Sequence, residues 1–132
     1  MAALLLLSAC GQETENTQEV TQMHTTDRTS IYKNITAEEA KEIMDTQEGY
    51  IILDTRTQEE FDEGHIPGAM VLPHDAVLEK AESVLTDKDQ LILVYCRSGR
   101  RSKLAAEDLV TLGYTNIREF GGIIDWPYET VK

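Results

Sequence analysis

The sequence predicts an α/β fold with a single folded domain, in which parallel strands are joined by helical crossovers. From Ile31 onward, segments with the apolar spacing of helices alternate with short, continuous apolar runs. Such runs are typical of strands that are buried on both faces, and their alternation with helices favours a parallel sheet. The length of 132 residues allows one domain of this kind and little more.

Capping boxes mark the start of two helices in the first half of this domain. Thr36 to Glu39 form the first box, ahead of a helix that should stop near Gly49. Thr57 to Glu60 form the second box and open a short helix. Between the two helices, the apolar run Tyr50 to Leu53 predicts a buried strand that ends at Asp54.

The middle of the chain contains a loop, a short strand and a third helix. Gly64 to Ala69 must form a loop because of their glycine and proline content, and Val71 with Leu72 predict a short strand after it. One face of the helix is predicted by apolar residues at helical spacing, namely Val77, Leu78, Ala81, Val84 and Leu85.

The central strand of the sheet is predicted by Leu91 to Tyr95, the most apolar and β-branched segment of the chain. This strand ends at Cys96. After it, the apolar spacing of residues 104–112 predicts a helix that ends at Gly113, and Asn116 to Phe120 predict a last short strand.

Composition excludes several classes of protein. The chain has 24 acidic and 12 basic residues, which gives a formal charge of −12. Such a chain repels a phosphate backbone and an anionic lipid surface, so nucleic acid is excluded as a partner. Two cysteines cannot form a disulfide framework, and three separated histidines offer no metal-ligand spacing. We therefore expect neither structural zinc nor another cofactor.

The beginning of the chain predicts a targeting segment. Met1 to Cys10 are an apolar run closed by small residues, and Leu7 to Cys10 resemble the lipobox of bacterial lipoproteins. The resemblance implies cleavage before Cys10, lipidation of that cysteine and an extracytoplasmic, membrane-anchored protein. No Lys or Arg precedes the run, so we expect the true translation start to lie upstream. The alternative is a cytoplasmic protein whose first residues are apolar by chance.

Residues 11–30 predict a disordered tether. They are dominated by Gln, Thr, Glu and Asn, and Val20 and Met23 are their only larger apolar side chains. Such a segment cannot bury enough surface to fold, and its acidic excess favours an extended, solvated chain. The sequence thus divides into a signal remnant with lipobox at 1–10, the tether, and a folded domain at 31–132.

The loop after the predicted central strand is where we expect the chemistry. Ligands of open parallel sheets bind at the carboxyl ends of strands, which is the position of Cys96. Gly99 in this loop tolerates a positive φ, and successive N–H groups can form an anion nest. The loop and the residue after it also hold four of the chain's twelve basic residues, namely Arg97, Arg100, Arg101 and Lys103.

Cys96 is predicted to be a nucleophile, because neighbouring arginines and a helix N-terminus both favour thiolate over thiol. The alternative is a buried structural cysteine, one of the commonest core residues. A structural cysteine would be expected in apolar surroundings, whereas this one is followed by arginines.

Two groups of motifs follow one another along residues 31–132. The first group comprises Leu53 to Arg56, Glu60 with Phe61, and Gly64 to Ala69 up to Leu72 and Pro73. The second comprises Tyr95 to Ser102, Gly113 with Tyr114, and Gly121 to Ile123 before Trp126. Together they resemble the two signatures of the rhodanese-like sulfurtransferases.

The resemblance implies a five-stranded parallel sheet flanked by helices and a thiosulfate sulfurtransferase activity. In the family, the cysteine thiolate attacks the outer sulfur of thiosulfate, releases sulfite and passes its persulfide sulfur to cyanide or a thiol. Cys96 would play this part here. The loop matches the thiosulfate-using form, whereas mercaptopyruvate-using relatives have Gly in place of Arg97. We expect a monomer whose sulfane-sulfur donor is bound by the loop residues Arg97, Ser98, Gly99, Arg100, Arg101 and Ser102.

Other signature residues are expected to support this site. Asp54 and Arg56 follow the carboxyl end of a strand, where an ion pair or a loop-bracing hydrogen bond is favoured over proton transfer. Trp126 is expected to cover a wall of the pocket, and His65 to serve structure, as in the family. His74 is most simply the entry to a helix.

Two other functions stay open. One is a cysteine phosphatase, which shares this fold. Its pattern needs an arginine where this chain has Ser102, in a loop one residue longer, and no general acid is evident. The other is a persulfide carrier or docking module that hands sulfur to a protein partner, which an intact Cys96 leaves open.

Overall fold

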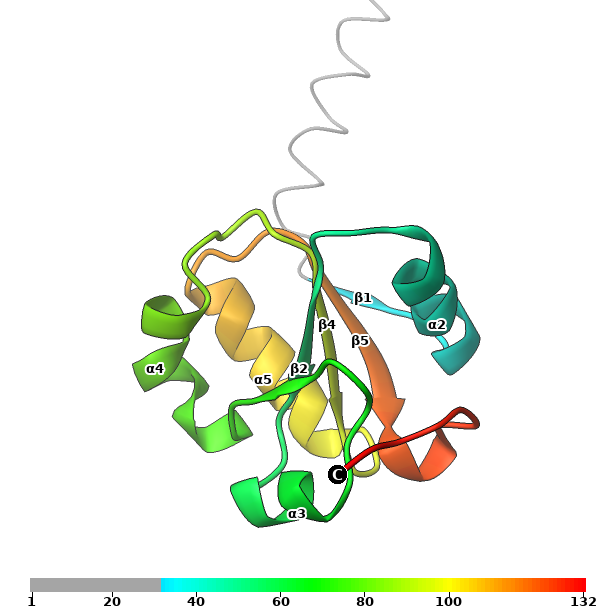
Figure 1. Ribbon diagram of the computed structural model, residues 1–132. Helices are drawn as coiled ribbons and strands as arrows, with labels where there is room; N and C mark the ends of the chain where they lie inside the picture. Colours follow the sequence, from blue (N-terminus) through cyan, green and yellow to red (C-terminus); the bar gives the residue numbers. More distant parts are fainter. Residues whose placement is uncertain (1–31) are drawn as a thin grey trace, which may run out of the picture. The chain divides into compact units, whose positions relative to one another are not determined.

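A five-stranded parallel sheet flanked by helices forms the domain (Figure 1), which confirms the predicted α/β class. The computed structural model describes residues 32–132, so the predicted signal segment, Cys10 and the tether lie outside the described residues. The strands are β1 (Lys33–Asn34), β2 (Ile51–Asp54), β3 (Met70–Val71), β4 (Ile92–Cys96) and β5 (Ile117–Gly122). The helices are α2 (Ala37–Thr46), α3 (Gln58–Glu63), α4 (Val77–Val84) and α5 (Arg100–Thr111), with short 3₁₀ turns η1 (His74–Ala76) and η2 (Ile123–Asp125).

The predicted central strand lies in the middle of the sheet. The strand order is β1-β5-β4-β2-β3, and all five residues of β4 are buried. Pairing with β2 is regular, whereas pairing with β5 shifts register between Val94 and Cys96, so that Cys96 is paired with Gly122. This irregularity lies where residues 96–102 leave the sheet. We call this segment, which contains Cys96, the nucleophile loop.

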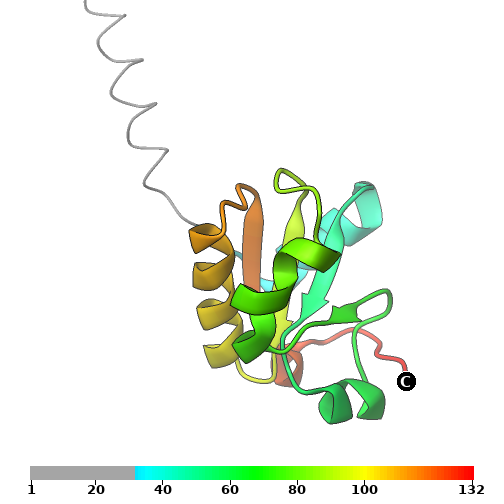
Figure 2. The same cartoon turned by 90° about the vertical axis from the view of Figure 1, so that its left-hand side faces the viewer.

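Each face of the sheet has its own hydrophobic core. Helices α4 and α5 cover one face, where Ile92 and Val94 of β4 pack with Leu109 (Figure 2). Helix α2 and the C-terminal segment cover the other face, where Leu93 and Tyr95 pack. Successive side chains of β4 therefore alternate between the two cores, as the pleat of a strand requires.

Both predicted capping boxes are present. The N–H of Glu39 donates to Oγ1 of Thr36 at 3.0 Å, and the N–H of Thr36 donates to the Glu39 carboxylate at 2.9 Å. Thr57 and Glu60 form the same reciprocal pair at 3.2 and 3.1 Å. Helix α2 ends at Thr46, earlier than expected, and Gly49 adopts a φ of +79° in the following turn.

Several boundaries differ from those predicted. Helix α5 begins at Arg100, ahead of the apolar residues from which it was predicted, because its N-terminal turn consists of basic loop residues. Strand β5 extends past Phe120 to Gly122. Strand β1 has two polar, exposed residues and therefore no apolar signal in the sequence. Among residues 32–132, none of the helices has the length and apolarity that a membrane span requires.

Candidate active site

Cys96 is the last residue of β4 and is followed by the turn that leads into α5. Its Sγ accepts a hydrogen bond of 2.9 Å from the N–H of Gly99. Gly99 is the N-cap of α5 and has a φ of +107°, which only glycine adopts readily. The predicted positive φ is therefore present, and it turns a backbone donor toward the sulfur.

Strand β5 supports the loop from one side. A Cβ on Gly122 would overlap the carbonyl group of Arg97 and approach Cα of Ser98 to 2.6 Å. The N–H of Ile124 also donates to the Arg97 carbonyl oxygen at 3.2 Å. Gly122 thus allows the loop backbone to lie directly on the end of β5.

A buried polar group supports the loop from behind. Oγ of Ser102 donates to the Glu119 carboxylate at 2.5 Å and lies 3.1 Å from the carbonyl oxygen of Gly99. Glu119 also accepts the N–H of Gly121 at 3.0 Å. Both Ser102 and Glu119 are almost fully buried. The Ser102 hydroxyl therefore joins α5 to β5 inside the fold, and the expectation that this residue belongs to the substrate-binding loop stays a prediction.

Sequence reasoning missed Glu119. The available signal is a carboxylate inside an otherwise apolar predicted strand, next to Phe120 and the glycine pair. A charged side chain in such a strand is buried only when it has hydrogen-bond partners. Because those partners include Ser102, which lies 17 positions earlier in the chain, the sequence alone does not identify them.

Arg101 forms an ion pair with Glu60 of α3. Two guanidinium nitrogens lie 2.9 and 3.1 Å from the two carboxylate oxygens. The hydrogen bond from Arg101, followed by bonds from Thr57, lowers the pKa of Glu60 to about 2. The hydrogen bond to Glu60, followed by the charge of Glu60 and to a smaller extent that of Cys96, raises the pKa of Arg101.

The other two arginines of the loop differ from Arg101. Arg97 and Arg100 are exposed and form no hydrogen bond through their side chains and no ion pair with any residue from 32 to 132. Their charges are therefore free to meet an anion at the mouth of the loop. Ser98 is exposed beside them.

Asp54 and Arg56 form the predicted ion pair behind β2. Nη2 of Arg56 lies 2.7 Å from the Asp54 carboxylate and donates to the carbonyl oxygen of Gly64 at 2.7 Å. The hydroxyl of Tyr95 donates to the same carboxylate at 2.6 Å. Burial, followed by the hydrogen bond to Asp54, raises the pKa of Tyr95. Through the bonds from Arg56 to Gly64 and from the Ile66 N–H to the Tyr95 hydroxyl, the group braces the loop before β3.

His65 also lies in a structural setting. Its ring stacks on Phe61 with centroids 3.8 Å apart, and Nδ1 lies 2.9 Å from the Phe61 carbonyl oxygen. Its backbone pairs with Val131 near the end of the chain. His74 opens η1, directly before α4, as expected for the entry to a helix.

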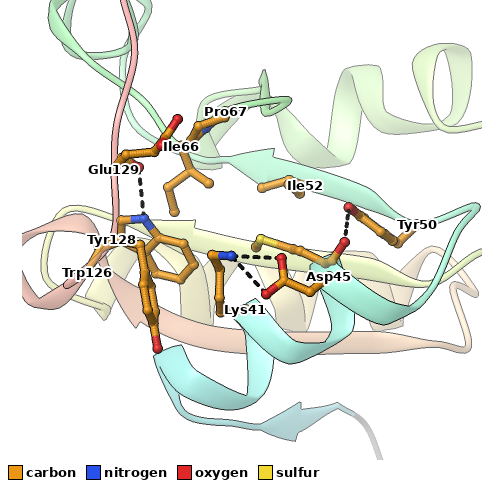
Figure 3. Close-up of a pocket in the computed structure, with 10 residues that line it drawn as sticks. Lys41, Asp45, Tyr50, Ile52, Ile66, Pro67, Trp126, Tyr128 and Glu129 are labelled. Atoms are coloured by element: carbon orange, nitrogen blue, oxygen red, sulfur yellow. Dashed lines mark hydrogen bonds and ion pairs between the residues drawn. The ribbon is translucent and has the colours of Figure 1, made fainter.

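Trp126 lines a pocket, but this pocket does not contain Cys96 (Figure 3). The cavity has a volume of about 480 Å³ and lies on the α2 face of the sheet. Its lining residues are Lys41, Met44, Asp45, Tyr50, Ile52, Ile66, Pro67, Trp126, Tyr128 and Glu129. The Trp126 ring packs between the rings of Phe120 and Tyr128. The expectation that Trp126 covers a wall of the pocket at Cys96 stays a prediction.

Comparison with known proteins gives one family. The family model described as rhodanese-like domain matches residues 36–127. The chain is 34% identical over 108 residues to the "Putative sulfur carrier protein YrkF" of Bacillus subtilis, covering 81% of this chain and 57% of the length of that relative. It is 35% identical over 80 residues to the thiosulfate sulfurtransferase PspE of Escherichia coli, covering 61% of this chain and 77% of PspE.

Solved structures give the same result. A rhodanese with anions from Escherichia coli has a TM-score of 0.59 and 34% identity, covering 63% of this chain and 98% of the other. A rhodanese-related protein from Thermoplasma volcanium has a TM-score of 0.65 and 30% identity, covering 76% of this chain and 98% of the other.

Proposed function

Because the chain belongs to the rhodanese-like domain family, we propose that it is a thiosulfate sulfurtransferase that works through a persulfide on Cys96. The observation that carries this proposal is the position of the Cys96 sulfur. It lies at the carboxyl end of the central strand and accepts the Gly99 N–H in a loop that carries the exposed arginines Arg97 and Arg100. This arrangement combines a nucleophile with complementary charge for a dianion.

In the first half of the proposed reaction, the Cys96 thiolate attacks the outer sulfur of thiosulfate. A bond forms between Sγ and that sulfur, the sulfur–sulfur bond of thiosulfate breaks, and sulfite leaves with the electron pair. Arg97 and Arg100 are exposed at the loop and offset the negative charge of the donor and of the departing sulfite.

In the second half, cyanide or a thiolate attacks the outer sulfur of the persulfide. Thiocyanate, or the persulfide of the acceptor thiol, is released and the electron pair of the broken bond returns to Sγ of Cys96. The Gly99 N–H, which donates to this sulfur, stabilises the thiolate that is regenerated. The cycle needs no group beyond the donor, the acceptor and this chain.

The test measures thiocyanate formation from thiosulfate and cyanide by the wild type and by Cys96→Ser. We expect activity in the wild type and none above a buffer blank in the variant, with unchanged circular dichroism showing that the variant is folded. Mass spectrometry of the thiosulfate-treated wild type should show the mass of one sulfur atom added at Cys96. Activity retained by Cys96→Ser would overturn the mechanism.

A second candidate function is a carrier that delivers the persulfide to a protein partner. It is favoured by the printed name of the relative YrkF and by Ile124, a large apolar side chain that is 59% exposed and whose backbone contacts the loop at Arg97. Single-turnover measurements separate the candidates. A carrier loads sulfur from thiosulfate but discharges it slowly to cyanide and small thiols, whereas an enzyme of small molecules turns over repeatedly.

A further inference from the structure

The pocket on the α2 face has the dimensions of a small-molecule site and is separate from the sulfur chemistry. Its volume of about 480 Å³ lies within the range of ligand sites, roughly 300 to 1,000 Å³. It is enclosed by α2, the start of β2, the loop after α3 and the C-terminal segment (Figure 3). Neither Cys96 nor any residue of its loop lines the cavity.

The floor of the pocket is apolar and aromatic. Ile52, Ile66 and Trp126 are buried there, and Tyr50 and Tyr128 form part of the walls. The Trp126 Nε1–H already donates to the Glu129 carbonyl oxygen at 3.2 Å, and the Tyr50 hydroxyl donates to a carbonyl oxygen of α2 at 3.0 Å. With these donors satisfied inside the protein, the floor presents surface for an apolar or aromatic body.

The rim of the pocket holds one cation and two anions. Nζ of Lys41 donates to both oxygens of Asp45, at 2.7 and 2.9 Å, and lies 5.4 Å from the centre of the Tyr128 ring. Glu129, also on the rim, forms no ion pair with any residue in the described part of the chain. The hydrogen bond to Asp45, followed by the charges of Asp45, Tyr128 and Glu129, raises the pKa of Lys41.

The contacts of Lys41 show which ligand chemistry the rim suits. An ammonium group is held there between a carboxylate and the face of an aromatic ring, and both partners attract cations. The Lys41 side chain is about one-third exposed and long enough to swing into solvent. Once Lys41 moves, the carboxylates of Asp45 and Glu129 give the rim two negative charges beside the aromatic wall.

We propose that this pocket binds a small organic amine. The ligand's ammonium takes the position that Lys41 occupies between Asp45 and Tyr128, and its apolar body lies on Ile52, Ile66 and Trp126. An organic anion of the same shape is disfavoured, because the carboxylates on the rim outnumber the lysine. This binding function is independent of the proposed sulfur transfer, since the cavity and the Cys96 loop share no residue.

The test uses the fluorescence of Trp126, which is the chain's single tryptophan and lines the pocket. The full chain is titrated with phenylpropylamine, phenylpropanol and phenylpropionate, which share one apolar body and differ in the charge of the head group. We expect a saturable change with the amine, binding about two- to five-fold weaker for the alcohol, and the weakest binding for the acid. Equal binding of all three, tighter binding of the acid, or no saturable response would overturn the proposal.

Four variants locate the binding. Asp45→Asn should weaken amine binding about two- to five-fold, whereas Lys41→Met should strengthen it by removing the competing ammonium. Glu107→Gln, an exposed change on α5, is the matched control and should leave the affinity unchanged. Cys96→Ser should also leave it unchanged. Loss of amine binding in Cys96→Ser, or an unchanged affinity in both pocket variants, would show that the amine binds elsewhere.

Discussion

At the scale of single residues, the arginines of the nucleophile loop have different tasks. Arg101 is committed to Glu60 through two hydrogen bonds, whereas Arg97 and Arg100 are exposed and free of described partners. The charge of Cys96 also contributes, less than Glu60 does, to raising the pKa of Arg101. Glu60 thus partly cancels a positive charge beside the sulfur and fixes where the guanidinium stands.

Replacing Glu60 tests this balance. Glu60→Gln keeps a side chain that can complete the capping box and accept a bond from Arg101, but removes the negative charge. We expect the KM for thiosulfate to fall about two- to five-fold with a smaller change in kcat, because the pair is partly exposed and such pairs are weak. Glu59→Gln, the exposed neighbour, is the control. An unchanged or raised KM would show that Glu60 does not limit donor binding.

The same ion pair makes stability depend on pH. The pKa of Glu60 is about 2 in the folded chain, below its ordinary value of 4.5. A lowered pKa means that the pair stabilises the fold above the unfolded value and that this contribution is lost as the pH falls through the folded value. The difference in free energy of unfolding between wild type and Glu60→Gln should therefore shrink as the pH falls from neutral toward 2.

We expect the Arg100 side chain to strengthen binding of the sulfur donor and to contribute nothing to the stability of the fold. Charge-assisted hydrogen bonds contribute about 1.5–3 kcal/mol, roughly 10- to 100-fold in affinity, and solvent exposure places Arg100 near the lower end. Arg100→Ala should thus raise the KM for thiosulfate about ten-fold at unchanged melting temperature. Arg101→Ala should also raise KM, but with a lower melting temperature because Glu60 loses its partner. If Arg100→Ala has the same KM as the control Lys80→Ala, backbone N–H groups alone bind the donor.

At the scale of elements, the loop takes its shape from β5. Gly122 lies where any Cβ would overlap the Arg97 carbonyl group, so Gly122→Ala must displace the loop that carries the nucleophile. We expect kcat/KM to fall at least about ten-fold, since small misplacements of reacting groups have large effects on rate. Gly49→Ala is the control, because its φ is +79° but a Cβ there meets nothing within 4 Å. It should lower the melting temperature and leave kcat/KM unchanged. An unchanged kcat/KM in Gly122→Ala together with a lowered kcat/KM in Gly49→Ala would contradict this role of Gly122.

Ser102 joins α5 to β5 and provides a second test at this scale. Ser102→Ala leaves the buried Glu119 carboxylate with one donor fewer, which should lower the free energy of unfolding by about 1–3 kcal/mol. The KM for thiosulfate should stay within about two-fold of the wild type, because the hydroxyl points into the fold. Urea unfolding and steady-state kinetics give the two readouts. A large rise in KM at unchanged stability would mean that Ser102 contacts the donor.

Structural features that depend only on residues close together in the sequence could be predicted from it. The capping boxes at Thr36 and Thr57 and the positive φ of Gly99 are local, and the apolar run of β4 reports its burial directly. The bond between Glu60 and Arg101 joins residues 41 positions apart and exists only once α3 and α5 are packed. For the same reason, sequence alone assigned Trp126 to a pocket without showing which face of the sheet that pocket occupies.

At the scale of the whole molecule, the nucleophile loop and the pocket on the α2 face share no residue within one small domain. The Cys96 loop starts α5 at the carboxyl end of β4, while the pocket that we propose to bind an amine is lined by α2 and the C-terminal segment. The chain as a whole carries a charge of −12, so its basic residues at the loop form a local exception. A negative surface elsewhere repels anions and leaves that loop as the favourable place for a dianionic donor.

We propose that the chain is held at a membrane through Cys10, which lies before the described residues. Leu7 to Cys10 resemble a lipobox, and a lipidated Cys10 would leave Cys96 as the one free thiol of a protein with two cysteines. A free reactive thiol in a secreted protein needs an explanation, which sulfur transfer supplies. Because one acyl chain binds membranes only marginally, we expect more than one chain on Cys10.

The test expresses the full reading frame, including any upstream in-frame codons, with Cys10 intact or changed to Ala. We expect the intact protein in the detergent-soluble membrane fraction and Cys10→Ala outside it, with acyl chains detected by mass spectrometry on the former alone. Thiosulfate sulfurtransferase activity should be equal in both, since the anchor and Cys96 belong to separate parts of the chain. Both versions found in the cytoplasm with Met1 retained would contradict the anchor and favour the alternative, a cytoplasmic protein whose first residues are apolar by chance.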